Sequence, residues 1–373
     1  MGQARCVQTH CGGHRKPRLD PRVSTQLRHV RMVHFAWPVA SPATARAPRR
    51  PERQLIPEVE DMKKSLIALA VLGTLAATAQ AQSNVTLYGR VDLGVARNLG
   101  DDYMVMQNGS GSRLGVRGVE DLGGGLKALF NIEHRFNADT GAVNSTSSFW
   151  NGRSVVGLEG GFGQVVLGRE YTPARNIANR ADPWGGDTVA RMEPILFGAI
   201  LPTRQNNSIT YTSPSFNGLR AQAQLTMDEV PGNDNKAFYG LNLSYGAGPL
   251  SLAYGYDKSG VDDNTWHLVT AGYDFGSFRL IGAYGQGTPE GVAAADKHRS
   301  YMIGATAPVG AGEVKLAYGK LEAVDPDQDV SSKFAVGYHY ALSKRTTVYF
   351  DVANDRELAD NKTGFDFGLK HNF

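Results

Sequence analysis

Cysteine and long apolar runs are both scarce in this chain. The 373 residues include two cysteines, Cys6 and Cys11, so no disulfide can staple the chain beyond its first few residues. After Ala81 no apolar run approaches the roughly 18 residues that a membrane-spanning helix needs. A mean hydropathy of −0.31 is also too polar for a bundle of membrane helices. A disulfide scaffold and a helical membrane protein are therefore excluded.

Basic charge is scarcer than the whole-chain net charge of +3 suggests. The first 81 residues hold 13 basic and 5 acidic residues, which leaves residues 82–373 with a net charge of −5. The basic character belongs to the N-terminal part alone, so the sequence indicates no nucleic-acid partner.

Catalytic and metal-binding patterns are missing as well. The histidines after residue 81 have no Glu-x-x-His or Gly-x-Ser-x-Gly context, and the glycine-rich runs lie between strands instead of before a helix. Cys6, His10, Cys11 and His14 match no zinc-finger spacing. We therefore expect no enzyme activity, no cofactor and no metal.

A secretory signal begins at Met62. Two lysines open it, an apolar stretch follows, and Ala79-Gln80-Ala81 forms a small-x-small cleavage site. The apolar stretch is too short for a membrane anchor. We expect residues 62–81 to be a signal peptide, residues 82–373 to be the mature barrel, and residues 1–61 to be a non-native extension from a mis-assigned start codon.

The rest of the chain shows apolar and polar residues in alternation, the pattern of β-strands. At the C-terminus Phe365, Phe367, Leu369, His371 and Phe373 share one face of an extended chain, with polar residues and glycine on the other. Such a strand could also end a soluble sandwich. A free edge carrying aromatics is an aggregation hazard, however, whereas a closed membrane barrel pairs that edge and turns the aromatics toward lipid.

The same alternation recurs along the whole mature chain. Dividing 292 residues among sixteen strands leaves about 18 per strand and connection, which suits a tilted membrane strand of about 10 residues. Short turns alternate with longer polar loops, as in outer-membrane barrels. The predicted strands are residues 85–95, 112–119, 126–137, 150–160, 164–170, 206–213, 219–227, 237–246, 249–257, 265–275, 278–286, 298–307, 313–321, 332–341, 345–354 and 362–373.

Several segments resemble the general diffusion porins of Gram-negative bacteria, in their β-proteobacterial branch. The resemblance spans the mature chain and is carried by VTLYGRVDLGV, SRLGVRGVEDLGGGLKALFNIE, GRSVVGLEGGFGQVVLGREYTPA, NNSITYTSPSFNGL and GYHYALSKRTTVYFDVA. It implies a 16-stranded antiparallel transmembrane β-barrel in the outer membrane, usually a homotrimer, that passes small ions and hydrophilic solutes. It also implies contact with outer-membrane lipid and lipopolysaccharide, and an assembly machinery that recognises Phe373.

One connection is far longer than the others. About 35 residues separate the strand ending near Glu170 from the strand starting near Asn206. Four prolines bar a regular strand there, and the apolar stretch 195–201 would be costly on an outer surface. We expect this third loop to fold into the lumen, as the resemblance implies; a surface flap with its own small core is the alternative.

The resemblance also implies where the pore is narrowest. It places Arg113, Arg153 and Arg204 on the wall, opposite the acidic residues Glu133 and Asp182. Any one arginine alone is more often a solvated surface charge, but the three within these motifs favour an anion-preferring constriction. The alternative is a channel of the same architecture selective for phosphate or organic anions. Further candidates on the loop are Tyr171, Arg175, Arg180 and Arg191.

Overall fold

The computed structural model describes five stretches of the chain, residues 84–196, 203–227, 237–260, 264–288 and 297–373. The expected extension, residues 1–61, and the expected signal peptide, residues 62–81, lie outside the described residues. No helix in the described part is long and apolar enough to cross a membrane.

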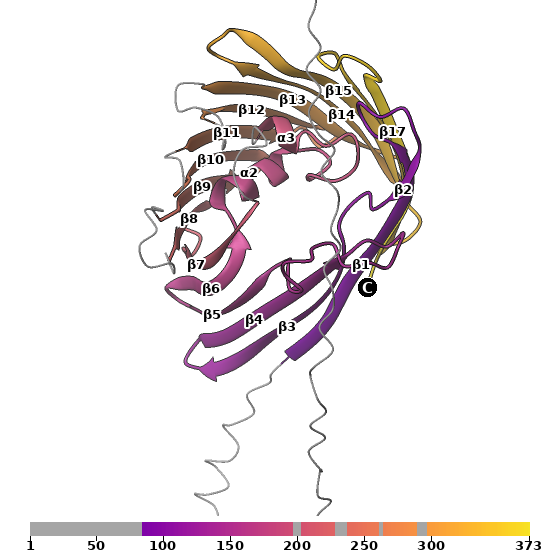
Figure 1. Cartoon of the computed structure of the whole chain (residues 1–373). Coiled ribbons are helices and arrows are strands. Elements are labelled where there is room, and N and C mark those ends of the chain that lie inside the picture. Colours follow the sequence, from indigo (N-terminus) through magenta and orange to yellow (C-terminus); the bar gives the residue numbers. More distant parts are fainter. Residues whose placement is uncertain (1–83, 197–202, 228–236, 261–263, 289–296) are drawn as a thin grey trace, which may run out of the picture. The chain divides into compact units, whose positions relative to one another are not determined.

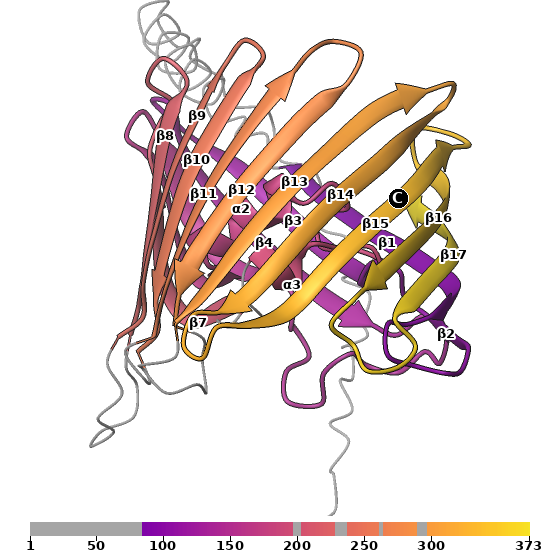
Figure 2. The same cartoon turned by 90° about the horizontal axis from the view of Figure 1, so that it is seen from above.

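Sixteen long strands form one antiparallel sheet that closes into a barrel, as the sequence predicts (Figures 1 and 2). Each long strand pairs with its neighbours in chain order, and β17 pairs back with β1. The long strands are β1 (Asn84–Arg97), β3 (Ser112–Gly123), β4 (Leu126–Phe136), β5 (Ser154–Gly160), β6 (Gly163–Tyr171), β7 (Arg204–Thr212), β8 (Leu219–Thr226), β9 (Tyr239–Ala247), β10 (Leu250–Lys258), β11 (Thr265–Asp274), β12 (Arg279–Gly287), β13 (His298–Val309), β14 (Gly312–Ala323), β15 (Gln328–Ala341), β16 (Thr346–Asp355) and β17 (Thr363–Asn372).

Two local features differ from the sequence prediction. A short strand, β2 (Val105–Gln107), pairs with β1 inside the first loop; its three residues are too few to show alternation. The strand predicted for residues 150–160 begins at Ser154. The residues before it belong to the preceding loop, although Gly152 N still donates to Glu133 O at 3.0 Å.

The barrel is closed by the C-terminal residue. Gly89 N donates to Phe373 O at 3.0 Å, and Phe373 N donates to Gly89 O at 3.1 Å. The ring of Phe373 lies where a side chain at position 89 would be, so glycine is needed there. The terminal aromatic therefore packs directly on the seam between β17 and β1, and neither strand keeps a free edge.

Side chains alternate between the outside and the lumen along each strand. In β17, Phe367 and Leu369 are exposed on the outside, whereas Asp366, directly before Phe367, is buried on the inside. In a membrane the outward apolar side chains face lipid, which agrees with the predicted orientation of this strand.

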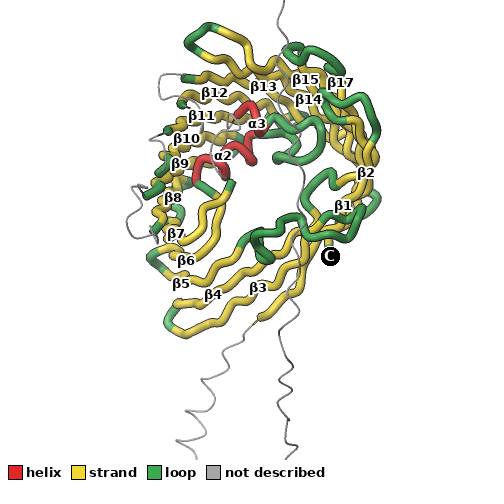
Figure 3. Tube along the Cα trace, viewed as in Figure 1, coloured by secondary structure: helices red, strands yellow, loops and turns green. Residues whose placement is uncertain are grey.

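The long third loop contains two helices that lie inside the ring of strands (Figures 1 and 3). Helix α2 (Pro173–Ala181) begins with proline at its first position, and the Thr172 side chain caps it by accepting from Arg175 N at 3.4 Å. It packs against β9, β10 and β11, whereas α3 (Glu193–Leu196) packs against β12, β13 and β14. Residues 197–201 of the predicted apolar stretch lie outside the described residues.

The connections divide the barrel into two sides. On one side two residues suffice between strands, as at Gly248-Pro249 and Gly310-Ala311, and both glycines take the positive φ that such a tight turn requires. We call this the turn side, which in outer-membrane barrels faces the periplasm. The opposite, loop side carries the longer connections.

Candidate functional site

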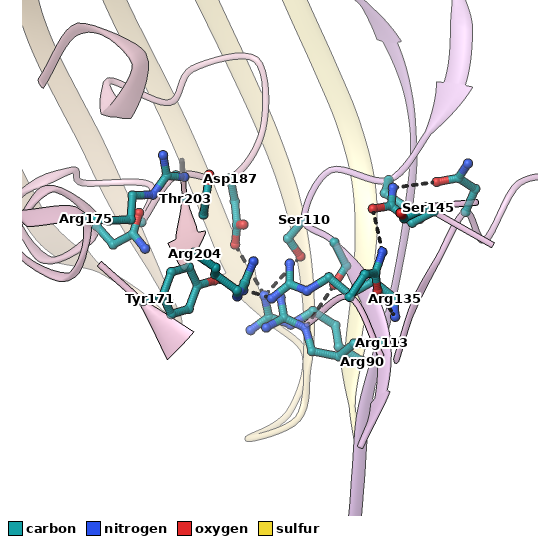
Figure 4. Close-up of a pocket in the computed structure, with 18 of the residues that line it drawn as sticks. Arg90, Ser110, Arg113, Arg135, Ser145, Tyr171, Arg175, Asp187, Thr203 and Arg204 are labelled. Atoms are coloured by element: carbon teal, nitrogen blue, oxygen red, sulfur yellow. Dashed lines mark hydrogen bonds and ion pairs between the residues drawn. The ribbon is translucent and has the colours of Figure 1, made fainter. Parts of the chain in front are cut away.

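A cavity of about 1080 Å³ opens beside the third loop, toward the loop side of the lumen. We call it the loop-side cavity (Figure 4). Arginine dominates its charged lining, which comprises Arg90, Arg113, Arg135, Arg169, Arg175, Arg191 and Arg204 together with Asp139 and Asp187.

Three of these arginines stand in one row across neighbouring strands. Arg90 of β1 pairs in register with Arg113 of β3, and Arg113 pairs with Arg135 of β4. Residues opposite one another in a sheet project from the same face, and like charges in that position destabilise the pair. Figure 4 shows Arg90 and Arg113 lying together at the cavity. Because the row works against folding, its presence points to a role in the lumen.

A buried carboxylate behind the row holds two of its arginines. Glu133 Oε1 accepts from Arg135 Nε at 3.0 Å, and Glu133 Oε2 lies 3.9 Å from Arg113 Nη1. The Tyr88 hydroxyl also donates to Glu133, at 3.3 Å. Glu133 is itself buried and is not part of the cavity lining. It therefore orients the guanidinium groups and offsets part of their charge from behind.

The neighbouring strands β6 and β7 extend the basic surface. The guanidinium carbon of Arg204 lies 3.8 Å from the centre of the Tyr171 ring, a stacked cation–π contact. The Tyr171 hydroxyl accepts from Arg135 Nη2 at 3.4 Å, and Arg169 Nη1 donates to Asn206 at 2.7 Å. These contacts fix the orientation of the arginines.

Opposite this wall, the third loop contributes charges of both signs. Asp187 Oδ2 accepts from Arg90 Nη1 at 3.3 Å, and burial raises the pKa of Asp187 while Arg90 opposes the shift. Arg175 bonds the carboxylate of Glu193. Burial lowers the pKa of Arg175 to about 10, so it remains cationic at neutral pH. The loop thus carries one acid that faces the wall arginines directly.

Asp182 organises the loop from within. Its carboxylate accepts from the backbone N–H groups of Trp184, Gly186, Met192 and Glu193 at 2.9–3.0 Å. Burial raises the pKa of Asp182 to about 6, an effect that these backbone hydrogen bonds oppose. Asp182 is 4% exposed and does not line the cavity, so it shapes the loop instead of facing the arginines.

Strand residues on the inner face fasten the loop. Trp184 Nε1 donates to Asp351 Oδ1 at 2.7 Å, and Val189 N donates to Asp366 Oδ2 at 3.1 Å. Lys333 Nζ donates to the carbonyl of Val189 at 2.8 Å. These contacts hold the loop against β15, β16 and β17.

The structure brings together five of the nine residues expected at the constriction. Arg113, Arg204, Tyr171, Arg175 and Arg191 all line the loop-side cavity. The other four do not: Arg153 Nε donates to Glu170 at 2.6 Å, Arg180 lines a different cavity, and Glu133 and Asp182 are buried as described above.

Sequence reasoning did not identify Arg90, Arg135, Arg169 or Asp187 as site residues. The alternating pattern of the strands could have identified two of them. Arg90 lies on the polar face of the first strand, and Arg135, two residues from Glu133, projects from the same face as Glu133. For Asp187 the sequence holds no such signal, because the turns of an irregular loop decide which carboxylate faces the lumen.

Comparison with known proteins agrees with this architecture. The family model for the Gram-negative porin matches residues 68–360. Outer membrane porin protein 32 of Delftia acidovorans is 37% identical over 83% of this chain and 93% of its own length. An outer membrane porin of Bordetella pertussis is 29% identical over 84% of this chain and 100% of its own length.

Solved structures show the same fold. An anion-selective porin from Comamonas acidovorans superimposes with a TM-score of 0.67 and 32% identity, covering 78% of this chain and 100% of that one. OmpF of Salmonella typhi, at 15% identity and a TM-score of 0.62 over 78% of this chain and 97% of its own, shares the fold alone. Together with the closed barrel and the water-accessible lumen, these matches show that the chain belongs to the Gram-negative porin family and is an outer-membrane channel for passive diffusion.

Proposed function

We propose that this porin prefers anions and that the loop-side cavity sets the preference. The observation that carries the proposal is the charge of the lining, seven arginines against two aspartates. A narrow aqueous passage lined by one sign of charge concentrates ions of the opposite sign. The likeness to a solved porin described as anion-selective supports the same conclusion.

Local charge, and not the total charge, should decide the selectivity. The mature chain carries a net charge of −5, which by itself would favour cations. Charges farther from the ion than a Debye length of about 8 Å at physiological salt are largely screened. The arginines at the cavity therefore outweigh the distant acidic residues.

The residues have separate roles in this proposal. Arg90, Arg113 and Arg135 attract the anion from the wall, and Arg204, stacked on Tyr171, presents a rigid guanidinium beside them. Glu133 positions the row from behind. Arg153, paired with Glu170 outside the lining, and Arg180, in another cavity, add to the field at longer range.

Reversal potentials across a bilayer with a potassium chloride gradient test the proposal. The wild-type channel should favour chloride. R113Q/R135Q/R204Q should lower the chloride-to-potassium permeability ratio at least about fivefold, since a unit charge 4 Å from an ion in water is worth about 1 kcal/mol. R153Q is the matched control and should shift the ratio much less. A wild-type channel that favours potassium, or a triple variant with an unchanged ratio, would refute the assignment.

A channel selective for phosphate or organic anions is a second candidate. Arg204 favours it, because its Nε and Nη2 are buried without a hydrogen-bond partner among the described residues, and a planar fork suits phosphate or carboxylate. A selective site would make the phosphate current saturate at millimolar concentration. Current that rises linearly with phosphate would leave general diffusion as the function.

Processing and assembly follow from the sequence. We propose that residues 62–81 are removed as a signal peptide, that residues 1–61 are never made, and that the mature chain starts at Gln82. Intact-mass measurement of the protein from outer membranes should give this N-terminus. Any peptide from upstream of Met62 would contradict it.

We further propose that the barrel is a homotrimer embedded among outer-membrane lipid and lipopolysaccharide, and that the assembly machinery recognises Phe373. The packing of Phe373 on the β1–β17 seam supports the last point. Replacing Phe373 with Ser should lower the yield of heat-modifiable trimer strongly while the trimer that does form melts near the wild-type temperature. Normal trimer levels would show that the terminal aromatic is dispensable.

A further inference from the structure

A second, smaller cavity of about 310 Å³ lies near the turn side of the barrel. It is lined by the C-terminal half of α2 and by the turn-side ends of β8 to β12, and we call it the turn-side cavity. Three elements each contribute an arginine to it: Arg180 from α2, Arg220 from β8 and Arg279 from β12. We propose that it binds small organic anions that combine a carboxylate with a short apolar chain.

The two cavities are separate sites on opposite faces of one helix. Arg175 and Asn179 of α2 line the loop-side cavity, whereas Ile177, Arg180 and Ala181 line the turn-side cavity. The two linings share no residue. The inference therefore requires that the chain be a channel, but it does not depend on the selectivity proposed for the loop-side cavity.

Strand register explains why the turn-side cavity is hollow. Arg220, Ser244, Ala253 and Thr270 are successive cross-strand partners on β8, β9, β10 and β11, so they project together into the lumen. The three residues beside Arg220 are small. They leave room in front of the sheet into which a guanidinium and a ligand can fit.

Arg279 is held in position over this hollow. Its Nη2 donates to Ser251 Oγ at 3.2 Å. A side chain at Gly272 would come within 3.1 Å of the same Nη2, so the glycine provides the space in which the guanidinium lies. The one bond to Ser251 leaves most of the five donors of Arg279 available, and a donor fixed in advance loses less entropy when a ligand binds.

Among the described residues, the lining of the turn-side cavity carries positive charge alone. No aspartate or glutamate lines it, and within the described residues no carboxylate pairs with Arg180, Arg220 or Arg279. The loop-side arginines, in contrast, have Glu133, Glu193 and Asp187 beside them. Asp274, the cross-strand partner of Arg279, accepts from Gly276 N at 2.7 Å instead of forming an ion pair. Three guanidinium groups without an ion pair in a partly enclosed space attract an anion, and their planar forks match a carboxylate.

Apolar residues complete the lining and determine the class of anion. Ile177, Ala181 and Ile281 are buried at its surface. A chloride ion would gain nothing from them, whereas a short alkyl chain would. Each methylene removed from water improves binding by up to about fourfold. The lining therefore favours hexanoate over butyrate, and butyrate over acetate.

Block of single-channel current tests this order. With the channel in symmetric potassium chloride, acetate, butyrate or hexanoate is added first to one side and then to the other, and the half-blocking concentration is measured. We expect block to strengthen with chain length and to be stronger from one side, because the cavity lies nearer one mouth. Equal block by the three anions would overturn the proposal.

Variants separate a binding site from a diffuse electrostatic effect. R180Q/R220Q/R279Q should raise the half-blocking hexanoate concentration about tenfold or more, since charge-assisted hydrogen bonds are lost. R345Q, which removes a charge from the exposed β15–β16 turn, is the matched control. Its half-blocking hexanoate concentration should equal that of the wild type. Unchanged block in the triple variant would overturn the site.

A charge-conserving double variant, R220K/R279K, keeps the field and the fold but loses the planar forks. We expect it to weaken hexanoate block several-fold while the chloride-to-potassium permeability ratio stays at the wild-type value. Wild-type hexanoate block in R220K/R279K would show that only the field acts. A wild-type channel that favours potassium yet shows chain-length-dependent block would refute the loop-side assignment alone and leave the turn-side site standing.

Discussion

Two halves of the inner barrel surface share one strand pattern and differ in chemistry. The arginine wall, formed by the inward side chains of β1, β3, β4, β6 and β7, presents charge to water. The covered wall, formed by the inward side chains of β10 to β16, presents apolar residues such as Trp266, Leu268 and Met302 to the third loop. Charged groups need water and apolar groups need a cover, so the loop lies over one half and leaves the other half open.

Glycines on the covered wall let the loop helices pack closely against the strands. A side chain at Gly255 would come within 2.9 Å of the Ala174 Cα in α2, and one at Gly319 within 3.0 Å of Ile195 Cδ1 in α3. The helices therefore lie directly on the strand backbone at these points. Inward-facing small and apolar residues on these strands therefore provide the surface on which the loop rests.

Of the changes that test the difference between the arginine wall and the covered wall, detaching the third loop from the covered wall should have the largest effect. Trp184 is buried and bonds Asp351, and truncating a core Trp costs about 3–5 kcal/mol. Because the strand ladders do not depend on it, Trp184→Ala should leave the barrel folded and loosen the loop. We expect trypsin to cleave at Arg180 or Arg191 and the single-channel current to become noisier.

Trp150→Ala is the matched control, since Trp150 is exposed in the loop before β5. It should change neither the cleavage pattern nor the noise. A Trp184→Ala channel that resists trypsin and conducts as quietly as the wild type would mean that the backbone bonds to Asp366 and Lys333 hold the loop without the indole.

Most of the fold was predictable because strand alternation is a local signal. Period-2 patterning located all sixteen long strands, and the prolines and length of the third loop set it apart. The covered wall can also be recognised in the sequence, by strands in which both faces are apolar. In β11, Trp266 and Leu268 face inward while Val269 faces outward, so a strand that is apolar on both faces indicates a covered inner surface.

The site was less predictable because it depends on register and on loop conformation. The row formed by Arg90, Arg113 and Arg135 exists only when three strands are aligned, and hairpin register is not visible in any one strand. Arg153 and Arg135 are both charged and both near a strand end, yet only Arg135 lines the cavity. The direction of a side chain at a strand end is decided by the loop that follows or precedes it.

A smaller effect should follow when α2 is forced away from the covered wall without removing a buried side chain of the loop. Gly255→Val would place a side chain against the backbone of Ala174, so α2 must shift, at a cost of about 1–3 kcal/mol. We expect partial trypsin cleavage of the loop and a modest change in conductance. Gly282→Val, at a position on β12 where a side chain would meet nothing within 4 Å, should behave as the wild type. Equal protection of the loop in both variants would show that close packing at Gly255 is not required.

The smallest expected effect concerns the single loop acid that faces the arginine wall. Burial raises the pKa of Asp187 from its ordinary value, so it gains a proton earlier than an ordinary aspartate as the pH falls from neutral. Protonation removes a negative charge from the cavity and releases Arg90 from its ion pair. The chloride-to-potassium permeability ratio should therefore rise as the pH is lowered.

Asp187→Asn should show the raised ratio already at pH 7 and a flatter pH profile, whereas Asp360→Asn, at an exposed position outside both cavities, should titrate like the wild type. If Asp187→Asn kept the full pH response, the titrating group would have to lie elsewhere in the lumen, and the pairing of Asp187 with Arg90 would not tune the selectivity.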